Sequence, residues 1–430
     1  MKMSSFLPQD QVFWYVSRRD IKPLNHDITT DVVVIGGGMA GLTAAQSFQK
    51  RGHKVVLLEK NYCGSGATGK SSGFITPDAE LSLGDLISSQ GESQAKILWQ
   101  FIERGVASIR TNIHEFNLDC DYQKQDTLII ANTERAFTND IKVDHESRLK
   151  LAYDSTLYSA DQLQKMLGSD QYKGGMSYGN SFGIHGYRYC SGMRNVLEEQ
   201  GVQIYEETPV IDIQDHVVKT PAATIKAEHI IVCTDRFAQS LDTLYDKVFQ
   251  VQTILMLSAP LTAAQVKMLF PQDQYMVWDT DLVYNYFRLT GDNRLMLGGS
   301  NVFNTYVSQE THNPRSIVKK LTHYFNEKFP GVNPQFEYVW PGLIGITKDV
   351  FPIAGYDRTM PSVYYVTGAT GLPWAATLGA YSAEVILDNN KDFEHCLSPY
   401  RSFTLGAFTQ RILGTRLTFA LSNFLQVGSV

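Results

Sequence analysis

A strand, a glycine-rich turn, a helix and a second strand near the amino terminus constrain this chain more than any other segment. The run DVVVI at residues 31–35 is short, apolar and β-branched, which is typical of a strand covered on both faces of a sheet. Apolar residues recur at helical spacing over 40–51, Gly52 ends that segment, and residues 55–58 form another apolar run. We therefore predict a βαβ unit with parallel strands.

The turn carries the pattern G-x-G-x-x-G, formed by Gly36, Gly38 and Gly41. Glycines at this spacing allow a tight turn and a close approach of the backbone to a pyrophosphate, which the helix amino terminus also favours. Glu59 ends the second strand, where an acidic side chain accepts hydrogen bonds from both ribose hydroxyls and argues against NADP. The motif in this context predicts a dinucleotide site, which also includes Met39, Ala40 and Lys60.

The length and charge of the chain limit the remaining possibilities. A chain of 430 residues exceeds what one hydrophobic core usually holds, so we expect two domains. Hydrophobic residues at 43% and charged residues at 19% are typical of a folded soluble protein. The formal net charge of −6 provides no basic field for nucleic acid, which leaves small molecules as the expected ligands.

The cysteines and histidines indicate no metal site. Five cysteines are scattered without a C-x-x-C pair, and ten histidines lack the spacings H-x-x-x-H and H-E-x-x-H. Residues 1–20 lack the apolar core and cleavage site of a secretory signal, and no apolar run reaches the roughly 18 residues of a membrane span. We expect a cytoplasmic protein.

A second glycine-rich stretch, GSGATGKS at 64–71, matches the P-loop pattern G-x-x-x-x-G-K-[ST]. A P-loop follows its strand directly and begins a regular helix, whereas here residues 61–63 intervene and Gly73 and Pro77 interrupt the segment after the motif. The apolar run that ends in an acid at 230–235 resembles the second element of an ATPase, but such strands are common. The position behind a complete dinucleotide unit favours a dinucleotide over ATP hydrolysis.

The same stretch, extended to GSGATGKSSG at 64–73, resembles the corresponding segment of the D-amino acid oxidase-like (DAO) FAD oxidoreductases. Further segments are similar to that family, especially to its gamma-glutamylputrescine oxidoreductases and its glycine or sarcosine oxidases: 183–187, 201–210, 230–234, 340–355 and 368–371. The resemblance spans about residues 28–390 and implies FAD as the cofactor.

Together with the strand pattern, the resemblance implies an α/β fold in which a discontinuous, Rossmann-like FAD-binding domain carries an inserted, strand-rich α+β substrate domain. We place the FAD-binding domain at 28–85, 166–244 and 340–394 and the substrate domain at 86–165 and 245–339. Residues 395–430 are then a carboxy-terminal tail.

The resemblance also assigns further residues to FAD. They are Gly66, Ala67, Thr68, Lys70, Ser71, Ser72 and Gly73 of the second glycine stretch, Val210 near the adenine, Thr234 on the adenosine side, and Gly368, Thr370, Gly371 and Leu372 near the pyrimidine edge of the flavin. A helix that begins at this last segment would stabilise negative charge on the reduced flavin.

Two positions in the predicted flavin-ring segment bear on the chemistry. Lys348 is the candidate cation beside the ring, and a solvated surface lysine is the alternative. Some members of the family bond the flavin covalently through a cysteine that precedes a Thr-x-Asp element, but the matching position here is Gly342. Non-covalent FAD is expected.

Candidate substrate residues lie on a strand predicted at 284–289, which resembles the putrescine-type members. Alternation places Tyr284, Tyr286 and Arg288 on one face. If that face points inward, Arg288 binds a substrate carboxylate and Tyr286 shapes the site; if it points outward, these are ordinary solvent-facing residues. Asp279 and Asp281 are candidates to bind the distal ammonium of a polyamine instead.

These features favour FAD-dependent oxidation of a carbon–nitrogen bond in a small amine or amino acid, with hydride transfer to flavin N5 and hydrolysis of the imine. No dedicated acid–base residue is required, because the protein contributes orientation and electrostatic stabilisation. The alternatives are an NAD-dependent dehydrogenase built on the same βαβ unit and a non-catalytic FAD-binding protein. The electron acceptor and the oligomeric state stay open.

The carboxy-terminal tail contains no acidic side chain after Glu394, while Arg401, Arg411 and Arg416 punctuate an aromatic and aliphatic stretch. An amphipathic segment that contacts a membrane surface or a partner is one interpretation. The low cationic charge favours the other interpretation, a tail packed on its own domain.

Overall fold

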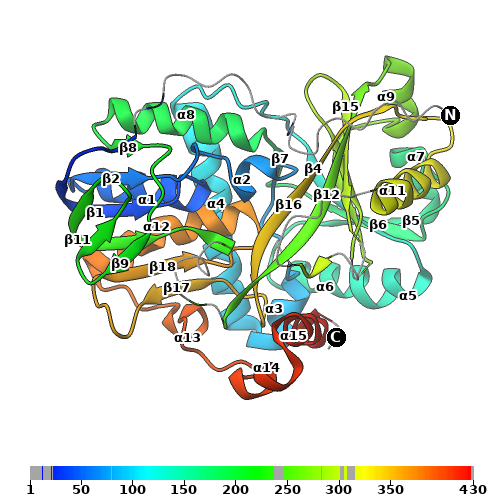
Figure 1. Ribbon diagram of the computed structural model, residues 1–430. Coiled ribbons are helices and arrows are strands. Elements are labelled where there is room, and N and C mark those ends of the chain that lie inside the picture. The colour runs from blue at the N-terminus through cyan, green and yellow to red at the C-terminus, as the bar shows by residue number, and fades with distance from the viewer. Residues whose placement is uncertain are drawn as a thin grey trace.

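Two eight-stranded sheets form the framework of the protein, in a computed structural model (Figure 1). The structure describes residues 12, 21, 23–78, 80–236, 244, 246–281, 283–300, 305–307 and 315–427. The expectation about a secretory signal concerns residues 1–20, which lie outside the described residues apart from Val12.

The first sheet has the strand order β17-β18-β11-β1-β2-β8, with β10 and then β9 attached beside β11. Its strands are β1 (Ile28–Ile35), β2 (Val55–Leu58), β8 (Gln203–Tyr205), β9 (Asp212–Gln214), β10 (Val217–Lys219), β11 (Thr224–Val232), β17 (Ile353–Tyr356) and β18 (Val363–Thr367). Val34 of β1 pairs in parallel with Leu57 of β2 and with Ile231 of β11. The predicted βαβ unit is confirmed, with α1 (Met39–Gln49) between β1 and β2.

Alternation along β1 explains why the whole strand is apolar. Val32 and Val34 pack in the cluster that includes α1 and the helices α4 (Glu92–Glu115) and α12 (Leu372–Asp388). Val33 and Ile35 point to the opposite face and pack with residues of β2, β10 and β11. The strand is therefore buried on both faces, as its sequence predicts.

The second sheet has the strand order β16-β12-β15-β14-β13-β4-β6-β5. Its strands are β4 (Asp126–Ala131), β5 (Thr156–Ser159), β6 (Gly174–Tyr178), β12 (Val248–Pro260), β13 (Tyr275–Asp279), β14 (Tyr286–Leu289), β15 (Arg294–Gly299) and β16 (Phe336–Thr347). Ile254 and Met256 of β12 pack in a cluster with α7 (Ala160–Leu167) and α11 (Arg315–Lys328). Leu255 and Leu257 point to the other face and join a separate cluster with Tyr62 and Tyr187. That face of the second sheet is therefore turned toward the loop after β2 and toward α8 (Gly186–Glu199), which carry these two tyrosines.

The remaining elements belong to neither of the two large sheets. They are a small sheet of β3 (Phe74–Ile75) and β7 (Phe182–Gly183), and the helices α2 (Ala67–Lys70), α3 (Leu83–Gln90), α5 (Glu134–Ala136), η1 (Phe137–Ile141), α6 (Lys142–Lys150), α8 (Gly186–Glu199), α9 (Ala263–Leu269), α13 (Glu394–Leu397), α14 (Ala407–Leu413) and α15 (Thr415–Val427). In Figure 1, α15 lies at the lower boundary between the two halves of the molecule.

The sequence also predicts a helix at 191–200 and a strand at 210–213, and both are misplaced by a few residues. The helix begins at Gly186, because the side chain of His185 accepts a hydrogen bond from the Arg188 backbone N–H and caps it. The strand begins only at Asp212, where pairing with β10 starts. The chain crosses repeatedly between the two sheets, and the predicted domain boundaries remain our proposal.

Candidate functional site

A cavity of about 1380 Å³ lies between the first sheet and the inner face of the second. On one side it is lined by residues at the carboxyl ends of parallel strands, among them Gly36 after β1, Glu59 after β2 and Thr234 after β11. Ligands of open α/β sheets bind at such strand ends. The volume exceeds the roughly 300–1,000 Å³ of ordinary ligand pockets, so a dinucleotide and a small substrate fit together.

Most of the residues predicted for the site line this one cavity: Gly36, Gly38, Met39, Ala40, Glu59, Lys60, Gly66, Ala67, Thr68, Lys70, Ser71, Ser72, Val210, Thr234, Tyr286, Gly342, Gly371 and Leu372. Six predicted residues do not line it: Gly41, Gly73, Arg288, Lys348, Gly368 and Thr370. Segments that are far apart in the sequence thus meet, and four of the exceptions, Gly41, Gly368, Lys348 and Arg288, have structural explanations.

The first glycine turn leaves no room for side chains. Gly36 has φ +109°, and a Cβ there would lie 2.4 Å from the Cys233 carbonyl oxygen. A Cβ on Gly41 would lie 1.8 Å from the Gly36 oxygen, so Gly41 serves the packing of α1 on β1 and not the cavity wall. The N-cap of α1, Gly38, makes no side-chain capping bond, which leaves the helix amino terminus available to an anion.

Glu59 is buried beside this turn. One carboxylate oxygen accepts a hydrogen bond from the Gly37 N–H at 2.8 Å, and the other accepts one from the Asn61 N–H at 2.9 Å. Burial raises the pKa of Glu59, and these backbone donors oppose that shift. These bonds fix the carboxylate. Oε1 also accepts a hydrogen bond from the Ser65 hydroxyl at 3.4 Å, while Oε2 keeps a further acceptor position that suits a ribose hydroxyl of a dinucleotide.

The second glycine stretch packs against the first turn. Thr68 Oγ1 accepts a hydrogen bond from the Met39 N–H at 3.1 Å, at the start of α1. The helix α2 is only four residues long, and the chain after it is extended at Ser71 and leads into β3. A P-loop would begin a regular helix here, so this geometry disfavours the ATPase alternative.

The opposite end of the cavity is formed by a second helix amino terminus. Gly371 has φ +110° and begins α12 without a side-chain cap. The half-buried Asp235 accepts hydrogen bonds from the backbone N–H groups of Gly345, at 2.9 Å, and of Gly368. Through these hydrogen bonds Asp235, the acid of the ATPase alternative, connects β16 to the turn that precedes α12. Gly368 therefore contributes to the structure of this turn.

The residues present fit FAD. Two helix amino termini with glycine at the N-cap face one cavity, a glycine turn permits close backbone approach, and Glu59 faces the place of a ribose. The buried hydroxyl of Thr234 lines the same cavity and has no hydrogen-bond partner among the described residues. Gly342, where a covalent link would need a cysteine, also lines the cavity.

The structure supports neither interpretation of Lys348, as a cation beside the flavin ring or as a solvated surface lysine. The residue is buried, not solvated, and its Nζ lies over the rings of Phe403 and Phe419, 5.5 Å from each centroid. Burial lowers the pKa of Lys348. The side chain therefore points toward the carboxy-terminal segment and away from the cavity, because it follows β16 at the point where the tail covers it.

The structure does not support the predicted carboxylate contact of Arg288 either. Arg288 is 0% exposed, and its guanidinium donates to the carbonyl oxygens of Ser72, at 2.7 Å, Ile184, at 2.7 Å, and Leu289, at 3.1 Å. Burial lowers its pKa to about 10. Arg288 thus joins three backbone segments through three hydrogen bonds, and it does not line the cavity.

Beyond the flavin end, aromatic side chains form a wall of the cavity. The ring of Phe74 lies 6.0 Å from that of Trp278 and 5.8 Å from that of Tyr286, and Tyr284 lies 5.7 Å from Tyr286. We call the part of the cavity bounded by these four residues and Glu80 the acidic chamber. Such rings present electron-rich faces, which attract cations.

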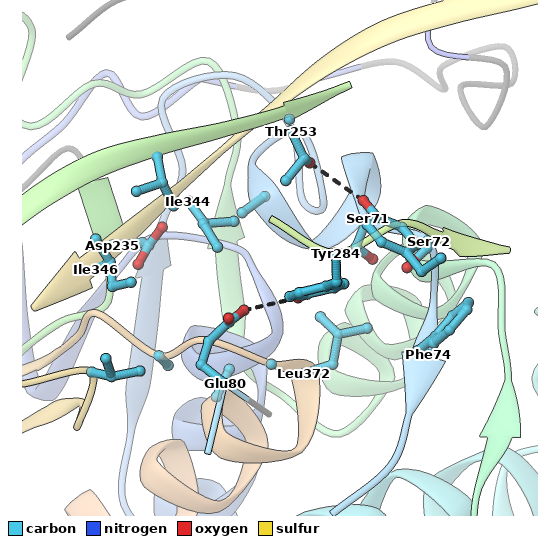
Figure 2. A pocket seen from close by; sticks show the side chains of 18 of the residues that line it. Ser71, Ser72, Phe74, Glu80, Asp235, Thr253, Tyr284, Ile344, Ile346 and Leu372 are labelled. Carbon is cyan, nitrogen blue, oxygen red and sulfur yellow. Dashed lines mark hydrogen bonds between the residues drawn. The ribbon is translucent and has the colours of Figure 1, made fainter. Parts of the chain in front are cut away.

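Glu80 gives this chamber its charge. Figure 2 shows its carboxylate directed at Tyr284, whose hydroxyl donates to Glu80 Oε1 at 3.1 Å. That is the one hydrogen bond of the carboxylate among the described residues, and burial raises its pKa. A poorly solvated carboxylate with a single donor is stabilised by an incoming cation.

Asp279, a second acidic residue near the chamber, already accepts hydrogen bonds through both carboxylate oxygens. Asp279 accepts hydrogen bonds from the backbone N–H groups of Asp281 and Asn285, from the Asn285 amide and, at 2.8 Å, from the Tyr324 hydroxyl. The predicted role of Asp279 as an ammonium ligand is therefore disfavoured, whereas Asp281 is exposed at the cavity rim.

A buried ion network forms a further part of the wall. Arg148 Nη2 donates to Asp78 at 2.7 Å, and Arg148 Nε donates to Asp144 at 2.8 Å. Tyr178 also donates to Asp78, and the guanidinium lies 3.8 Å from the Tyr178 ring centroid. This network ties the loop that carries Glu80 to α6 and β6.

Sequence reasoning missed Glu80 and the Asp78–Arg148 network, and it considered Asp235 only as the acid of the ATPase alternative. Neither Glu80 nor Asp78 belongs to a motif, and they act through Tyr284 and Arg148, which are far away in the chain; Asp235 acts in the same way through Gly345. A carboxylate in a loop belongs to no periodic sequence pattern, so the sequence does not show whether it faces a cavity or the solvent.

Comparisons with known proteins agree with this geometry. The model of the FAD dependent oxidoreductase family (DAO) matches residues 31–386. The probable oxidoreductase OrdL of Haemophilus influenzae is 28% identical over 407 residues, which cover 90% of this chain and 91% of that protein. Gamma-glutamylputrescine oxidoreductase of Escherichia coli is 27% identical over 353 residues, 81% of each chain.

Among solved structures, glycine oxidase from Geobacillus kaustophilus superposes with a TM-score of 0.75. The match covers 87% of this chain and 100% of that one at 18% sequence identity. This similarity shows the fold.

Proposed function

This chain belongs to the DAO family of FAD-dependent oxidoreductases, and on that premise we propose that it oxidises a carbon–nitrogen bond of a small, positively charged amine. The observation that carries the proposal is the Glu80–Tyr284 pair at the aromatic wall of the cavity that also contains the glycine turn. Gamma-glutamylputrescine oxidoreductase, among the similar proteins, bears the name of a polyamine derivative, which supports the same substrate class.

The first part of the mechanism is retention of the cofactor. The glycine turn and the α1 amino terminus would hold the pyrophosphate, Glu59 a ribose, and the backbone of residues 369–372 the flavin end. Bound FAD supplies the hydride acceptor for the oxidation. The positive end of α12 favours negative charge at that end of the cavity.

The second part is capture of the amine. Glu80 binds an ammonium group through the carboxylate oxygens, while Tyr284 holds Oε1 by its hydroxyl and the rings of Phe74, Trp278 and Tyr286 exclude water. The raised pKa of Glu80 also allows this carboxylate to accept a proton from the ammonium. With Arg288 committed to backbone carbonyls, no guanidinium stands ready for a substrate carboxylate at that position.

Anaerobic reduction of the purified flavoprotein tests the proposal. Putrescine and putrescine derivatives should bleach the flavin absorbance faster than sarcosine, glycine and D-amino acids. If a hydroxyl-bearing substrate alone bleaches it, oxidation of a carbon–nitrogen bond is wrong although the family stands. Protein that no amine bleaches would favour the non-catalytic alternative.

A further inference from the structure

The two carboxy-terminal helices are apolar on the outside. Phe408 is 75% exposed and Ile412 is 67% exposed on α14, and Leu417, Leu421 and Phe424 are exposed on α15. With Leu413 and Leu425, these residues define what we call the outer face of α14–α15. The other exposed large hydrophobic residues, Ile97, Val143, Leu149, Ile211, Met268 and Tyr356, are scattered over the chain. Single exposed residues of this kind are normal, whereas a contiguous group marks an interaction surface.

The buried side of α15 explains why its apolar side faces outward. Asn423 is buried, and its amide donates to the carbonyl oxygens of Thr347, at 2.8 Å, and Lys348, at 3.0 Å. Its Oδ1 accepts a hydrogen bond from the Tyr306 hydroxyl at 2.9 Å. Thr418 and Ser422 are buried on the same helix. Together with the buried ring of Phe419, these polar anchors fix the helix with its leucines toward the solvent, whereas an ordinary surface helix keeps its leucines on the buried side.

The charge of this segment is opposite to that of the rest of the protein. Residues 395–430 contain no Asp or Glu, and Arg411 and Arg416 are exposed on the two helices. The whole chain carries a formal charge of −6. An anionic surface is attracted to these helices and repelled by the remainder of the molecule, which would orient the protein.

We propose that the outer face of α14–α15 docks on an anionic lipid bilayer, lying in the interface and not crossing it. The cationic charge of the segment is low, but interfacial binding depends on buried apolar area together with attraction to anionic lipids, and the exposed apolar face provides that area. Within the described part of the chain, no helix has the length and apolar character needed to span a bilayer. A second copy is the less suitable occupant, because a twofold contact would bring the arginines of both copies together.

The docking surface is continuous with the rim of the cavity. Leu421 and Phe424 belong to the outer face and also line the cavity. A bilayer at this surface would therefore lie beside the cavity that holds FAD. Membrane docking goes beyond the proposed oxidation and does not depend on which amine is the substrate.

Co-sedimentation of the full-length flavoprotein with vesicles tests the proposal. We expect binding to phosphatidylcholine vesicles that contain phosphatidylglycerol, and much weaker binding to phosphatidylcholine alone. The combined variant Phe408→Ser, Ile412→Ser and Leu417→Ser should bind at least about tenfold more weakly, because its buried apolar area is smaller. Arg411→Gln should weaken binding to the anionic vesicles by about fivefold.

Matched variants separate docking from general effects. Leu149→Ser and Ile211→Ser remove exposed apolar residues elsewhere and should leave vesicle binding unchanged, as should Lys319→Gln for a basic residue. Equal sedimentation of the wild type and the combined variant would overturn the proposal. So would sedimentation-velocity data in which the wild type is a dimer without vesicles and the combined variant is a monomer, because a second copy would then cover the face.

Discussion

The glycine turn and the acidic chamber are two ends of the same cavity, but they are encoded in different ways. The turn is local: Gly36, Gly41 and Glu59 lie within one βαβ unit, and their spacing alone indicates a dinucleotide. The chamber is assembled from Phe74 of β3, Glu80 of the loop after β3, Trp278 of β13, Tyr286 of β14 and Tyr284 just before β14. The cofactor end is thus constrained by backbone geometry, whereas the substrate end depends on side chains that can be exchanged without disturbing the fold.

The largest effect is expected at the backbone of the turn. Gly41→Ala would place a Cβ 1.8 Å from the Gly36 carbonyl oxygen, so α1 must move away from β1. We expect a loss of more than about 4 kcal/mol in the free energy of unfolding and a colourless protein. Denaturant titration measures the free energy of unfolding, and the flavin absorbance measures the FAD content. Gly406→Ala, whose Cβ would meet nothing within 4 Å, is the control; if Gly41→Ala retains FAD and stability as that variant does, the turn is not constrained as described.

Arg288 tests whether a residue predicted for the substrate belongs to the scaffold instead. Arg288→Ala leaves the carbonyl oxygens of Ser72, Ile184 and Leu289 without their donors and should lower stability by about 3 kcal/mol. The ratio of KM values for carboxylate-bearing and simple amines should not change. A selective rise in KM for carboxylate-bearing amines, with stability intact, would restore the carboxylate contact.

Glu80 tests the substrate end. Glu80→Gln keeps the shape but loses the charge, and we expect kcat/KM for amines to fall about 100-fold, or about 2.7 kcal/mol, with unchanged FAD content. Tyr284→Phe should cost about tenfold through the lost hydrogen bond. Asp281→Asn removes an exposed charge at the rim and is the matched control, with a much smaller expected effect. Equal losses in Glu80→Gln and Asp281→Asn would mean that general charge, not the Glu80–Tyr284 pair, attracts the amine.

Stability distinguishes this binding role of Glu80 from a structural one. Burial raises its pKa in the folded protein, so protonation favours folding at low pH, and that contribution is lost as the pH rises through the raised pKa. The neutral amide of Glu80→Gln should therefore leave the thermal midpoint at neutral pH equal or higher when no amine is present. A clearly lower midpoint would assign Glu80 to the scaffold.

Glu59 should give a smaller loss at the cofactor end. Glu59→Ala removes the acceptors for the ribose but not the turn, and each charged hydrogen bond contributes about 1.5–3 kcal/mol. We expect FAD to dissociate at least about tenfold more readily, with the amine preference of the reconstituted enzyme unchanged. Fluorescence of released flavin on dilution measures this. Unchanged retention would show that the backbone alone holds the cofactor.

The smallest expected effect is a displacement of the pH profile. Below the raised pKa of Glu80 the carboxyl group is protonated and no longer attracts an ammonium, so kcat/KM should fall as the pH falls through that pKa. The acidic limb should lie above the pH range of an ordinary glutamate and should disappear in Glu80→Gln. A limb that persists in this variant belongs to another group.

The sequence by itself determined the βαβ unit, the glycine turn, the acid at Glu59 and the family, because each depends on backbone conformation or spacing within a short segment. It also indicated that the second glycine stretch and residues 368–372 join the same site. Only the tertiary structure decided which polar side chains face the cavity. Arg288 and Lys348 are drawn into the protein by carbonyl oxygens and aromatic rings from distant segments, while Glu80 is left with one donor in the chamber. The reason is physical: a buried charge takes its role from the partners that long-range packing brings to it, and no local pattern records those partners.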